Sequence, residues 1–349
     1  MLSLMKTSDF DYVLPPELIA QTPISPRDAS RMLVCNRSNQ GRRHHIFHEL
    51  PSFLRPQDVM VINETRVIPA RLLGLKAETG VPVEFLLLKR LQTDAWEALV
   101  KPCRRLREGT MVIFGDGLLQ ACVEESLKEG TRKVRFMYEG LFENILETLG
   151  ETPLPPYIHE KLSDRERYQT VYATQDGSAA APTAGLHFTQ DILDRIRRMG
   201  IDIVPVLLHV GLGTFRPVKA EVVSDHAMHS EYYEVTQDAA DRINLAKSRG
   251  GRIVCIGTTS VRTLETVADS QGIVHPGSGE TSIFIKPGVQ FKACDMLLTN
   301  FHLPQSTLLM LVSAFMGRVN ALGAYDEAVK EGYRFFSFGD CMLIGEDLM

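Results

Sequence analysis

One stretch of the sequence, APTAGLHFTQDILDRIRRMGIDIVPVLLHVGLGTFRPV at residues 181–218, predicts a complete α/β unit. Thr189 is placed to cap a helix whose apolar residues recur at helical spacing, and Gly200 ends that helix. The run IDIVPVLLHV (201–210) is β-branched and almost wholly apolar, as expected of a strand covered on both faces. Because open parallel sheets usually bind ligands at the carboxyl ends of their strands, this unit predicts a site in its polar loops.

Four polar loops follow or flank predicted buried strands in this way. They are TAGLHFT (183–189), HVGLGTFRP (209–217), GTTSVRT (257–263) and TNFHLPQST (299–307). If the strands are parallel, the last three loops meet at one edge of the sheet. Helices that begin at 258–260 and 305–307 would direct free N–H groups to that edge, which suits a carboxylate or a phosphate.

The pattern of hydrophobic and polar residues changes between residues 72 and 138. Short alternating runs such as VPVEFLLLK and TMVIF are separated by turn signals such as GDG, and no helical pattern intervenes. This pattern favours a small antiparallel β-barrel or sandwich. Because patterns typical of alternating strands and helices lie on both sides, we expect an inserted domain at 72–138 within a discontinuous catalytic domain at 1–71 and 139–349. The predicted fold class is α/β, or α+β, with an inserted antiparallel barrel.

The bulk composition limits what the protein can bind. The chain has 349 residues, 44% of them hydrophobic, and a formal net charge of -5. Any nucleic acid would have to be held by local basic clusters against a mildly repulsive field. Two such clusters occur, GRRHH with Arg42 and Arg43, and KPCRRLR with Lys101, Arg104 and Arg105. Each is either a solvated turn or a contact to RNA phosphates, and the sequence leaves both readings open.

Cysteine usage and apolar runs give the expected compartment. Six scattered cysteines without a CxxC pair favour reduced thiols, so we predict no metal site. The opening MLSLMKTSDFDY has no apolar core of signal-peptide length. The longest apolar run, 308–316, is too short to cross a bilayer. We expect a cytoplasmic protein that does not contact a membrane.

The predicted sheet edge gathers side chains that could do chemistry. His187, His209 and His302 titrate near neutral pH and are candidate acid and base groups. A histidine beside an apolar strand is usually structural, but three histidines in loops of one kind favour a site. Phe215 and Phe301 adjoin polar residues, and their rings could face a bound cation.

Other residues of these loops allow two interpretations. Glu265 lies close to Arg262 along its predicted helix, so it is either a surface ion pair or a site carboxylate. Gly211 and Gly213 either admit a ligand or only permit a tight turn. No GxGxxG before a helix, GxxxxGK[ST], HExxH or GxSxG motif is present in the sequence. Spacing alone therefore predicts a site for charged groups and leaves its chemistry open.

Ordered motifs go further than spacing does. The chain resembles the S-adenosylmethionine:tRNA ribosyltransferase-isomerase family of queuosine biosynthesis in NETRVIPARL, APTAGLHFT, HVGLGTFRPV, GTTSVRTLE and TNFHLPQSTLLMLVSAF. The opening DFDYVLPPELIAQTP and the closing YRFFSFGDCMLI fit as well, so the resemblance covers essentially the whole chain. It implies a large α/β domain that carries an inserted β-barrel.

The resemblance also implies a reaction. The ribosyl group of S-adenosylmethionine would move onto 7-aminomethyl-7-deazaguanine at the wobble position of tRNAs with a GUN anticodon. Epoxyqueuosine would form, and adenine and methionine would leave. S-adenosylmethionine would be consumed as a substrate, and no metal or redox cofactor is implied. We expect a monomer or a weak homo-oligomer.

This chemistry can be assigned to residues as a hypothesis. His187 and His209 are the leading base and acid candidates, with His302 third. Arg262 and the Thr258–Thr259 turn would hold the methionine carboxylate, and Phe215 or Phe301 would face the sulfonium. The basic clusters would contact the tRNA backbone. The expected substrate-binding residues are Thr183, Gly211, Gly213, Thr214, Phe215, Arg216, Thr258, Thr259, Arg262, Glu265, Asn300 and Phe301.

Two rival functions are compatible with the residues alone. An RNA methyltransferase that uses S-adenosylmethionine would release S-adenosylhomocysteine, but the missing glycine-rich nucleotide turn disfavours it. A non-catalytic RNA-binding module is disfavoured by the acidic charge balance and by the concentration of polar loops at strand ends.

Overall fold

The computed structural model describes residues 5–127, 130–211 and 218–348. The chain divides into two compact units, which we treat separately. The large unit comprises Met1–Arg66, Pro155–Gln175 and Ala181–Met349, and the barrel unit comprises Val67–Leu154 and Asp176–Ala180. The inserted β-domain is therefore present, but its boundaries differ from the expected 72–138. The extension beyond residue 138 arises because helix α1 (Phe142–Leu149) packs its Phe142, Ile145 and Leu146 into the barrel core.

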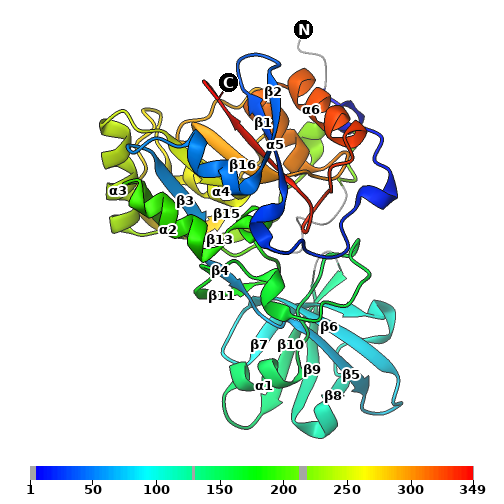
Figure 1. The fold of residues 1–349 in the computed structure, drawn as a ribbon. Coiled ribbons are helices and arrows are strands. Elements are labelled where there is room, and N and C mark those ends of the chain that lie inside the picture. Colours follow the sequence, from blue (N-terminus) through cyan, green and yellow to red (C-terminus); the bar gives the residue numbers. More distant parts are fainter. Residues whose placement is uncertain (1–4, 128–129, 212–217, 349) are drawn as a thin grey trace. The chain divides into compact units, whose positions relative to one another are not determined.

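A nine-stranded mixed sheet forms the centre of the large unit (Figure 1). Its strands are β1 (Arg31–Asn36), β2 (Arg42–Ile46), β3 (Val59–Asn63), β12 (Asp202–Leu208), β13 (Glu231–Val235), β14 (Ile253–Ile256), β15 (Gly277–Thr281), β16 (Met296–Asn300) and β17 (Cys341–Gly345). They lie in the order β15-β13-β12-β3-β14-β16-β17-β1-β2. The central strands β12, β3, β14 and β16 are parallel to one another, whereas β13, β15 and β17 pair antiparallel with β12, β13 and β16. The carboxyl ends of β12, β14 and β16 therefore meet at one edge, as the sequence predicted.

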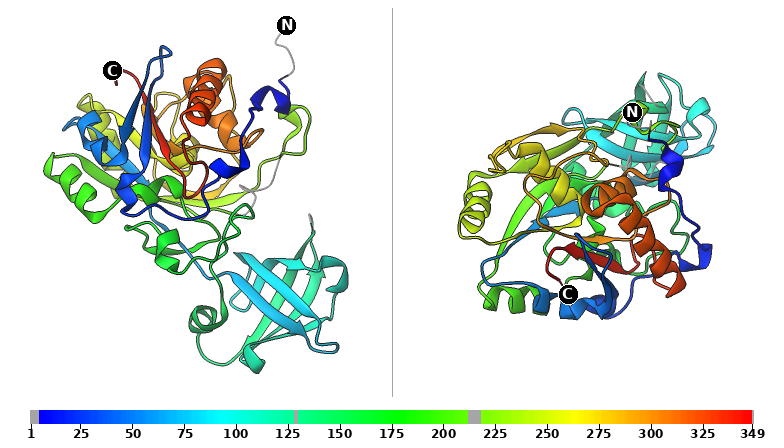
Figure 2. Two further views of the ribbon diagram at one scale, coloured as in Figure 1. Left: turned by 45° about the vertical axis from the view of Figure 1, so that its right-hand side comes forward. Right: turned by 90° about the horizontal axis from the view of Figure 1, so that it is seen from above.

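Helices cover both faces of this sheet. They are α2 (Gln190–Arg198), α3 (Gln237–Ser248), α4 (Gly257–Val267), α5 (Thr307–Met316) and α6 (Arg318–Lys330), with the 3-10 helix η4 (Phe47–Phe53). Alternate residues of a strand point to opposite faces. Leu33 and Val61 thus pack in one core with α3 to α6, and Val34 and Met60 pack in the other with α2 and η4. Figure 2 shows α5 and α6, coloured orange to red, side by side on their face of the sheet.

The stretch at 181–218 folds largely as its pattern predicts. The Thr189 side chain accepts a hydrogen bond from the N–H of Ile192 and caps α2. Gly200 follows the helix with a φ of 81°, a conformation that glycine adopts without strain. Strand β12 then runs through the middle of the sheet with most of its side chains buried. The 3-10 helix η9 (Thr183–His187) precedes α2.

Six antiparallel strands close the barrel unit, in the order β10-β7-β6-β5-β8-β9. They are β5 (Arg71–Lys76), β6 (Pro82–Arg90), β7 (Ala95–Lys101), β8 (Met111–Phe114), β9 (Leu119–Ser126) and β10 (Thr131–Tyr138). Phe85, Phe114 and Phe136 fill the interior. Two short strands, β4 (Thr65–Val67) and β11 (Gln175–Ser178), contain points at which the chain passes between the units.

No single helix of the described residues is long and apolar enough to span a membrane. Helices α5 and α6 reach the required length and composition only together, as a pair bent by 115°.

Candidate functional site

A pocket of about 70 Å3 lies at the carboxyl edge of β14 and β16 in the large unit. Four segments supply most of its lining, namely the loop at 181–184, the start of α4, the end of β16 with the residues that follow it, and residues 336–337, and Tyr157 and Val210 complete it. Six predicted site residues come together here: Thr183, Thr258, Thr259, Asn300, Phe301 and His302. Tyr157, Phe336 and Ser337 also line the pocket and were missed, because they lie in segments whose sequence shows only a proline-rich connector and a terminal strand.

His302 is held rigidly at the rim of this pocket. Its Nε2 atom lies 2.7 Å from the Oγ1 atom of Thr299, the neighbouring residue on the end of β16. Its backbone is fixed from both sides, because its N–H donates to the Tyr325 hydroxyl and its carbonyl accepts from the Tyr12 hydroxyl, at 3.0 and 2.6 Å. Burial lowers the pKa of His302 to about 3. The imidazole is therefore neutral at physiological pH.

The start of α4 presents donors to the pocket. Gly257 begins the helix with a φ of 85°, and no side chain caps the first turn. The hydroxyl of Thr259 is buried and makes no hydrogen bond to a described residue. Uncapped N–H groups and the positive end of the helix dipole together favour an anionic or hydrogen-bonding group of a ligand at this point.

Asn300 connects the pocket to the interior. Its Nδ2 donates to the carbonyl of Phe336 at 2.9 Å, and its buried Oδ1 makes no hydrogen bond of ordinary geometry within the described part of the chain. The same holds for Nε2 of His187, whose pKa is lowered to about 4 mainly by burial, with a smaller raising contribution from the Asn300 side chain.

His187 does not line the pocket, although it was the first candidate for the base. Its side chain is 4% exposed, its Nδ1 lies 2.7 Å from the hydroxyl of Ser30, and its ring packs against Phe47. This is the environment of a buried core histidine, with a hydrogen bond at Nδ1 and none of ordinary geometry at Nε2 among the described residues.

His209 lies next to Val210, which does line the pocket. Its Nδ1 is 2.9 Å from the hydroxyl of Thr65, and its ring stacks on Tyr232 with 5.8 Å between ring centroids. The histidine is part-buried and remains a predicted site residue. The predicted binding residues Gly213, Thr214, Phe215 and Arg216 lie outside the described residues.

Arg262 is committed to an internal ion pair. Its guanidinium pairs with the carboxylate of Glu231, both side chains are about 5% exposed, and Glu231 also accepts the N–H of Gly211 at 2.9 Å. Nε and Nη2 of Arg262 make no hydrogen bond to any described residue. Arg262 does not line the pocket. Its expected contact with the methionine carboxylate remains a prediction.

Of the two interpretations of Glu265, the surface ion pair with Arg262 is wrong, and the site carboxylate remains a prediction. Glu265 is 3% exposed, and its oxygens accept the backbone N–H groups of Lys292 and Ala293 at 2.9 to 3.0 Å. Burial raises the pKa of this carboxyl. Glu265 therefore holds a loop in place within the large unit and does not line the pocket.

The ring of Phe301 is not available to a sulfonium. Phe301 is fully buried and packs against Tyr325, Tyr333 and Phe335, with ring centroids 5.0 to 5.5 Å apart. The sequence placed an aromatic residue at the pocket correctly but could not show which way the ring points. Tyr157 and Phe336 also line the pocket, and their rings contact each other.

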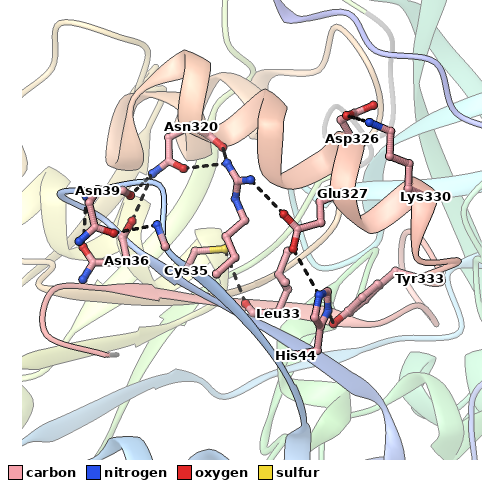
Figure 3. Close-up of polar contacts among 12 residues, drawn as sticks. Leu33, Cys35, Asn36, Asn39, His44, Asn320, Asp326, Glu327, Lys330 and Tyr333 are labelled. Carbon is pink, nitrogen blue, oxygen red and sulfur yellow. Dashed lines mark hydrogen bonds and ion pairs between the residues drawn. The ribbon is translucent and has the colours of Figure 1, made fainter.

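The GRRHH cluster is partly internal. The Arg42 side chain is 13% exposed, pairs with Glu327 at 3.0 Å and donates to the side-chain oxygen of Asn320 at 3.1 Å. Figure 3 shows this network, in which Glu327 also reaches His44 from α6. The charge of Arg42 is thus already paired within the fold, and its expected contact with tRNA remains a prediction. Arg43 is exposed on the edge strand β2 and remains a candidate.

The KPCRRLR cluster forms an open groove on the barrel unit. Arg104 and Arg105 are exposed, make no ion pair with a described residue, and line a groove of about 410 Å3 together with Lys76 and Arg107. Lys101 is exposed beside Glu84, 3.5 Å away. Four cationic side chains around one groove make it suited to phosphates.

Metal ligation has no support among the described residues, where no three His, Cys, Asp or Glu side chains lie together in a way that could hold an ion. The six cysteines are all unpaired thiols.

Comparison with known proteins gives a consistent result. A family model described as queuosine biosynthesis protein matches residues 7–344. The S-adenosylmethionine:tRNA ribosyltransferase-isomerases of Symbiobacterium thermophilum and Clostridioides difficile are 60% and 56% identical over 340 residues, which is 97% of this chain and 100% of each relative. A crystal structure of S-adenosylmethionine tRNA ribosyltransferase from Thermotoga maritima is 39% identical, covers 97% of this chain and 100% of its own, and superimposes with a TM-score of 0.56.

Proposed function

This chain belongs to the queuosine biosynthesis protein family, and on that premise we propose how its pocket carries out the family's reaction. The enzyme transfers and isomerises the ribosyl moiety of S-adenosylmethionine onto 7-aminomethyl-7-deazaguanine in tRNA. Epoxyqueuosine-tRNA forms, and adenine and methionine are released. What remains to be assigned is the work of individual residues.

The observation that carries our proposal is the placement of His302. Of the three candidate histidines, only this one lines the pocket, and its Nδ1 has no hydrogen-bond partner among the described residues. The sulfonium of S-adenosylmethionine acidifies the adjacent ribose 5′ carbon, so the first step needs a base. A neutral imidazole can accept that proton without first losing one, and the low pKa of His302 makes it a weak base that readily passes the proton on. We therefore place His302 ahead of His187 and His209 as the base.

The same residue can return the proton. Burial disfavours a charged imidazolium, so the protonated form of His302 would be a strong acid. Adenine leaves as an anion unless a proton reaches one of its ring nitrogens. Transfer of the proton from the 5′ carbon to His302 and then to the departing adenine balances both steps. The neutral aminomethyl nitrogen of the tRNA base then bonds to the ribosyl carbon that adenine has left and releases one proton to solvent. The epoxide closes as a ribose oxygen displaces methionine, which takes the C–S bonding electrons with it, from the 5′ carbon.

The start of α4 is our candidate for the methionine end of the substrate. Thr258 and Thr259 line the pocket where the first turn of the helix has no side-chain cap. A carboxylate there would accept backbone N–H groups and meet the positive end of the helix dipole. Arg262, one turn further along α4, would add a distant positive charge that Glu231 partly neutralises.

The groove around Arg104 and Arg105 is our candidate for the tRNA backbone. Arg104 and Arg105 make no ion pair with a described acidic residue. A phosphate that binds them therefore displaces only water and counterions. We also propose that the accepted tRNAs carry a GUN anticodon. The enzyme is proposed to act as a monomer or a weak homo-oligomer in the cytoplasm, without a metal or redox cofactor.

Product analysis tests the assignment of His302. Purified protein is mixed with S-adenosylmethionine and tRNA bearing 7-aminomethyl-7-deazaguanine, and adenine and methionine are quantified by chromatography. His302→Ala should slow their release by roughly 10²–10⁴-fold, the range for a lost acid–base group. His275→Ala is the matched control, because His275 is an exposed histidine of the same unit, paired only with Asp269. A loss below tenfold in His302→Ala would remove His302 from the chemistry.

A further inference from the structure

Phe336 has a strained backbone at the edge of the pocket. Its φ is 68°, in the left-handed region that bulky side chains rarely occupy. Three hydrogen bonds hold it there: its N–H donates to the Phe301 carbonyl, and its carbonyl accepts from Asn300 Nδ2 and from the Gly339 N–H, at 3.2, 2.9 and 3.0 Å. Such strain persists where the surroundings overdetermine it, and it occurs preferentially at ligand sites.

The strained residue completes an aromatic pair. The rings of Phe336 and Tyr157 meet with 4.7 Å between centroids at an angle of 50°, and both residues line the pocket. The Tyr157 hydroxyl lies 2.8 Å from the Ser337 hydroxyl, which fixes the orientation of the tyrosine ring. Tyr157 is half-buried and Phe336 is 4% exposed, and both belong to the lining of the pocket, unlike the Phe301 ring, which packs against three aromatic residues of the core.

The remaining lining indicates what such a wall would bind. None of the described residues around the pocket is acidic or basic apart from the neutral His302. Side-chain hydroxyls, one amide and apolar groups make up the rest. An uncharged flat heterocycle needs only stacking and hydrogen bonds, and this lining supplies both.

We propose that Tyr157 and Phe336 form the wall against which a purine-type base stacks in this pocket. The inference rests on the proposed function of the pocket and names the chemistry of one bound group. Two substrates carry such a base: the adenine of S-adenosylmethionine and the 7-deazaguanine of the tRNA. The buried Thr259 hydroxyl, which makes no hydrogen bond to a described residue, would pair with the polar edge of the base.

Leucine and phenylalanine substitutions test the wall. Binding of S-adenosylmethionine without tRNA is measured by calorimetry, and the KM for modified tRNA is measured separately. Tyr157→Leu and Phe336→Leu should each weaken binding of one substrate about tenfold, as expected when one stacking partner is lost. Tyr157→Phe keeps the ring and should bind within about threefold of wild type, since it loses only the hydroxyl contact to Ser337.

The two arms separate the sources of the base. A weaker Kd for S-adenosylmethionine identifies adenine, and a raised KM for tRNA with an unchanged Kd identifies the deazaguanine. Unchanged values in both arms would overturn the wall, whatever His302→Ala does to the rate. If both leucine variants unfold, hypochromism of the adenine absorption band on wild-type binding replaces them for that arm. The absence of hypochromism, together with an unchanged KM for tRNA in the strain-relieved variant Phe336→Gly, counts against the proposal.

The strain has its own test. Phe336→Gly removes both the ring and the strain, whereas Phe336→Ala removes the ring but keeps a side chain at positive φ. We expect both variants to bind the affected substrate equally poorly, and the glycine variant to melt at a higher temperature than the alanine variant. A glycine variant that binds like wild type would show that the ring is not part of the wall.

Discussion

The Nε2 atom of His302 lies 2.7 Å from the Oγ1 atom of Thr299, three residues earlier at the end of β16. This hydrogen bond fixes the ring while leaving Nδ1 as the nitrogen without a described partner. Thr299 is 1% exposed, so the contact is shielded from water. The pair therefore sets which imidazole nitrogen can take part in proton transfer.

Thr299→Val should lower kcat, because valine has nearly the same shape as threonine but cannot orient the ring. We expect a loss of about tenfold or more, consistent with a misaligned acid–base group. Thr299→Ser keeps the hydroxyl and should retain most of the activity. Equal losses in both variants would indicate that packing, and not the hydrogen bond, is what the rate depends on.

The pH dependence of the rate should lack the usual histidine limb. Because burial lowers the pKa of His302 to about 3, the group stays neutral as the pH falls through 6.5. The kcat profile is measured from pH 8 to pH 5 or to the limit of folding. The wild-type protein and His302→Ala should have profiles of the same shape, because His302 contributes no inflection in this range. An inflection near pH 6.5 that the substitution abolishes would contradict the buried, neutral state.

His187 should make the fold less stable in acid. Burial lowers its pKa to about 4 in the folded protein, against 6.5 in the unfolded chain. Between these values the unfolded state binds more protons, so stability is full above pH 6.5 and is lost as the pH falls toward 4. The slope of unfolding free energy against pH in this window should include about 1.4 kcal/mol per unit from His187.

Denaturant unfolding at several pH values measures this slope in wild type and in His187→Gln. The variant should be less stable at pH 7, because it disturbs the hydrogen bond to Ser30, but its stability should fall less steeply between pH 6.5 and pH 4. Parallel curves for the two proteins would show that His187 is not kept neutral by burial.

Two arginine clusters that look alike in sequence should behave differently toward tRNA. Arg104→Ala with Arg105→Ala removes two exposed cations of the barrel groove and should reduce the slope of log Kd against log salt by about 1 to 2. Arg42→Ala removes a charge already paired with Glu327. It should lower stability and leave the salt slope unchanged. Filter binding with unmodified tRNA over a range of salt distinguishes the two, and equal slopes for all three proteins would refute the groove.

The contrast between these arginines shows where sequence reasoning succeeds and fails. Local signals sufficed for α2, where Thr189 caps the helix and Gly200 ends it, and for the alternating strands of the barrel. They also predicted the edge at which Thr258 and His302 meet, because that placement follows from parallel strands. These features depend on neighbours within a few residues or on a regular topology.

Other features depend on partners that no local pattern reveals. Arg42 is neutralised by Glu327, which lies 285 residues away in the chain. Phe301 points into an aromatic core built by the final strand region, and helix α1 could by its amphipathic pattern alone have packed on either unit. Tyr157 follows a proline-rich connector and gains its role only because Phe336 adopts a positive φ beside it.

Replacing one member of the buried pair of Glu231 and Arg262 should destabilise the fold strongly, whereas replacing both members together should cost much less unfolding free energy. Glu231→Gln leaves the Arg262 charge without its carboxylate in a site about 5% exposed, which should cost about 3–5 kcal/mol of unfolding free energy. Adding Arg262→Met removes the stranded charge and should recover most of that loss. Recovery is expected because the desolvation cost of a buried ion can exceed its attraction to a partner. Denaturant unfolding of the wild type, the two single variants and the double variant gives the coupling energy. If the losses of stability in the two single variants simply add in the double variant, the two side chains do not depend on each other and the prediction is wrong.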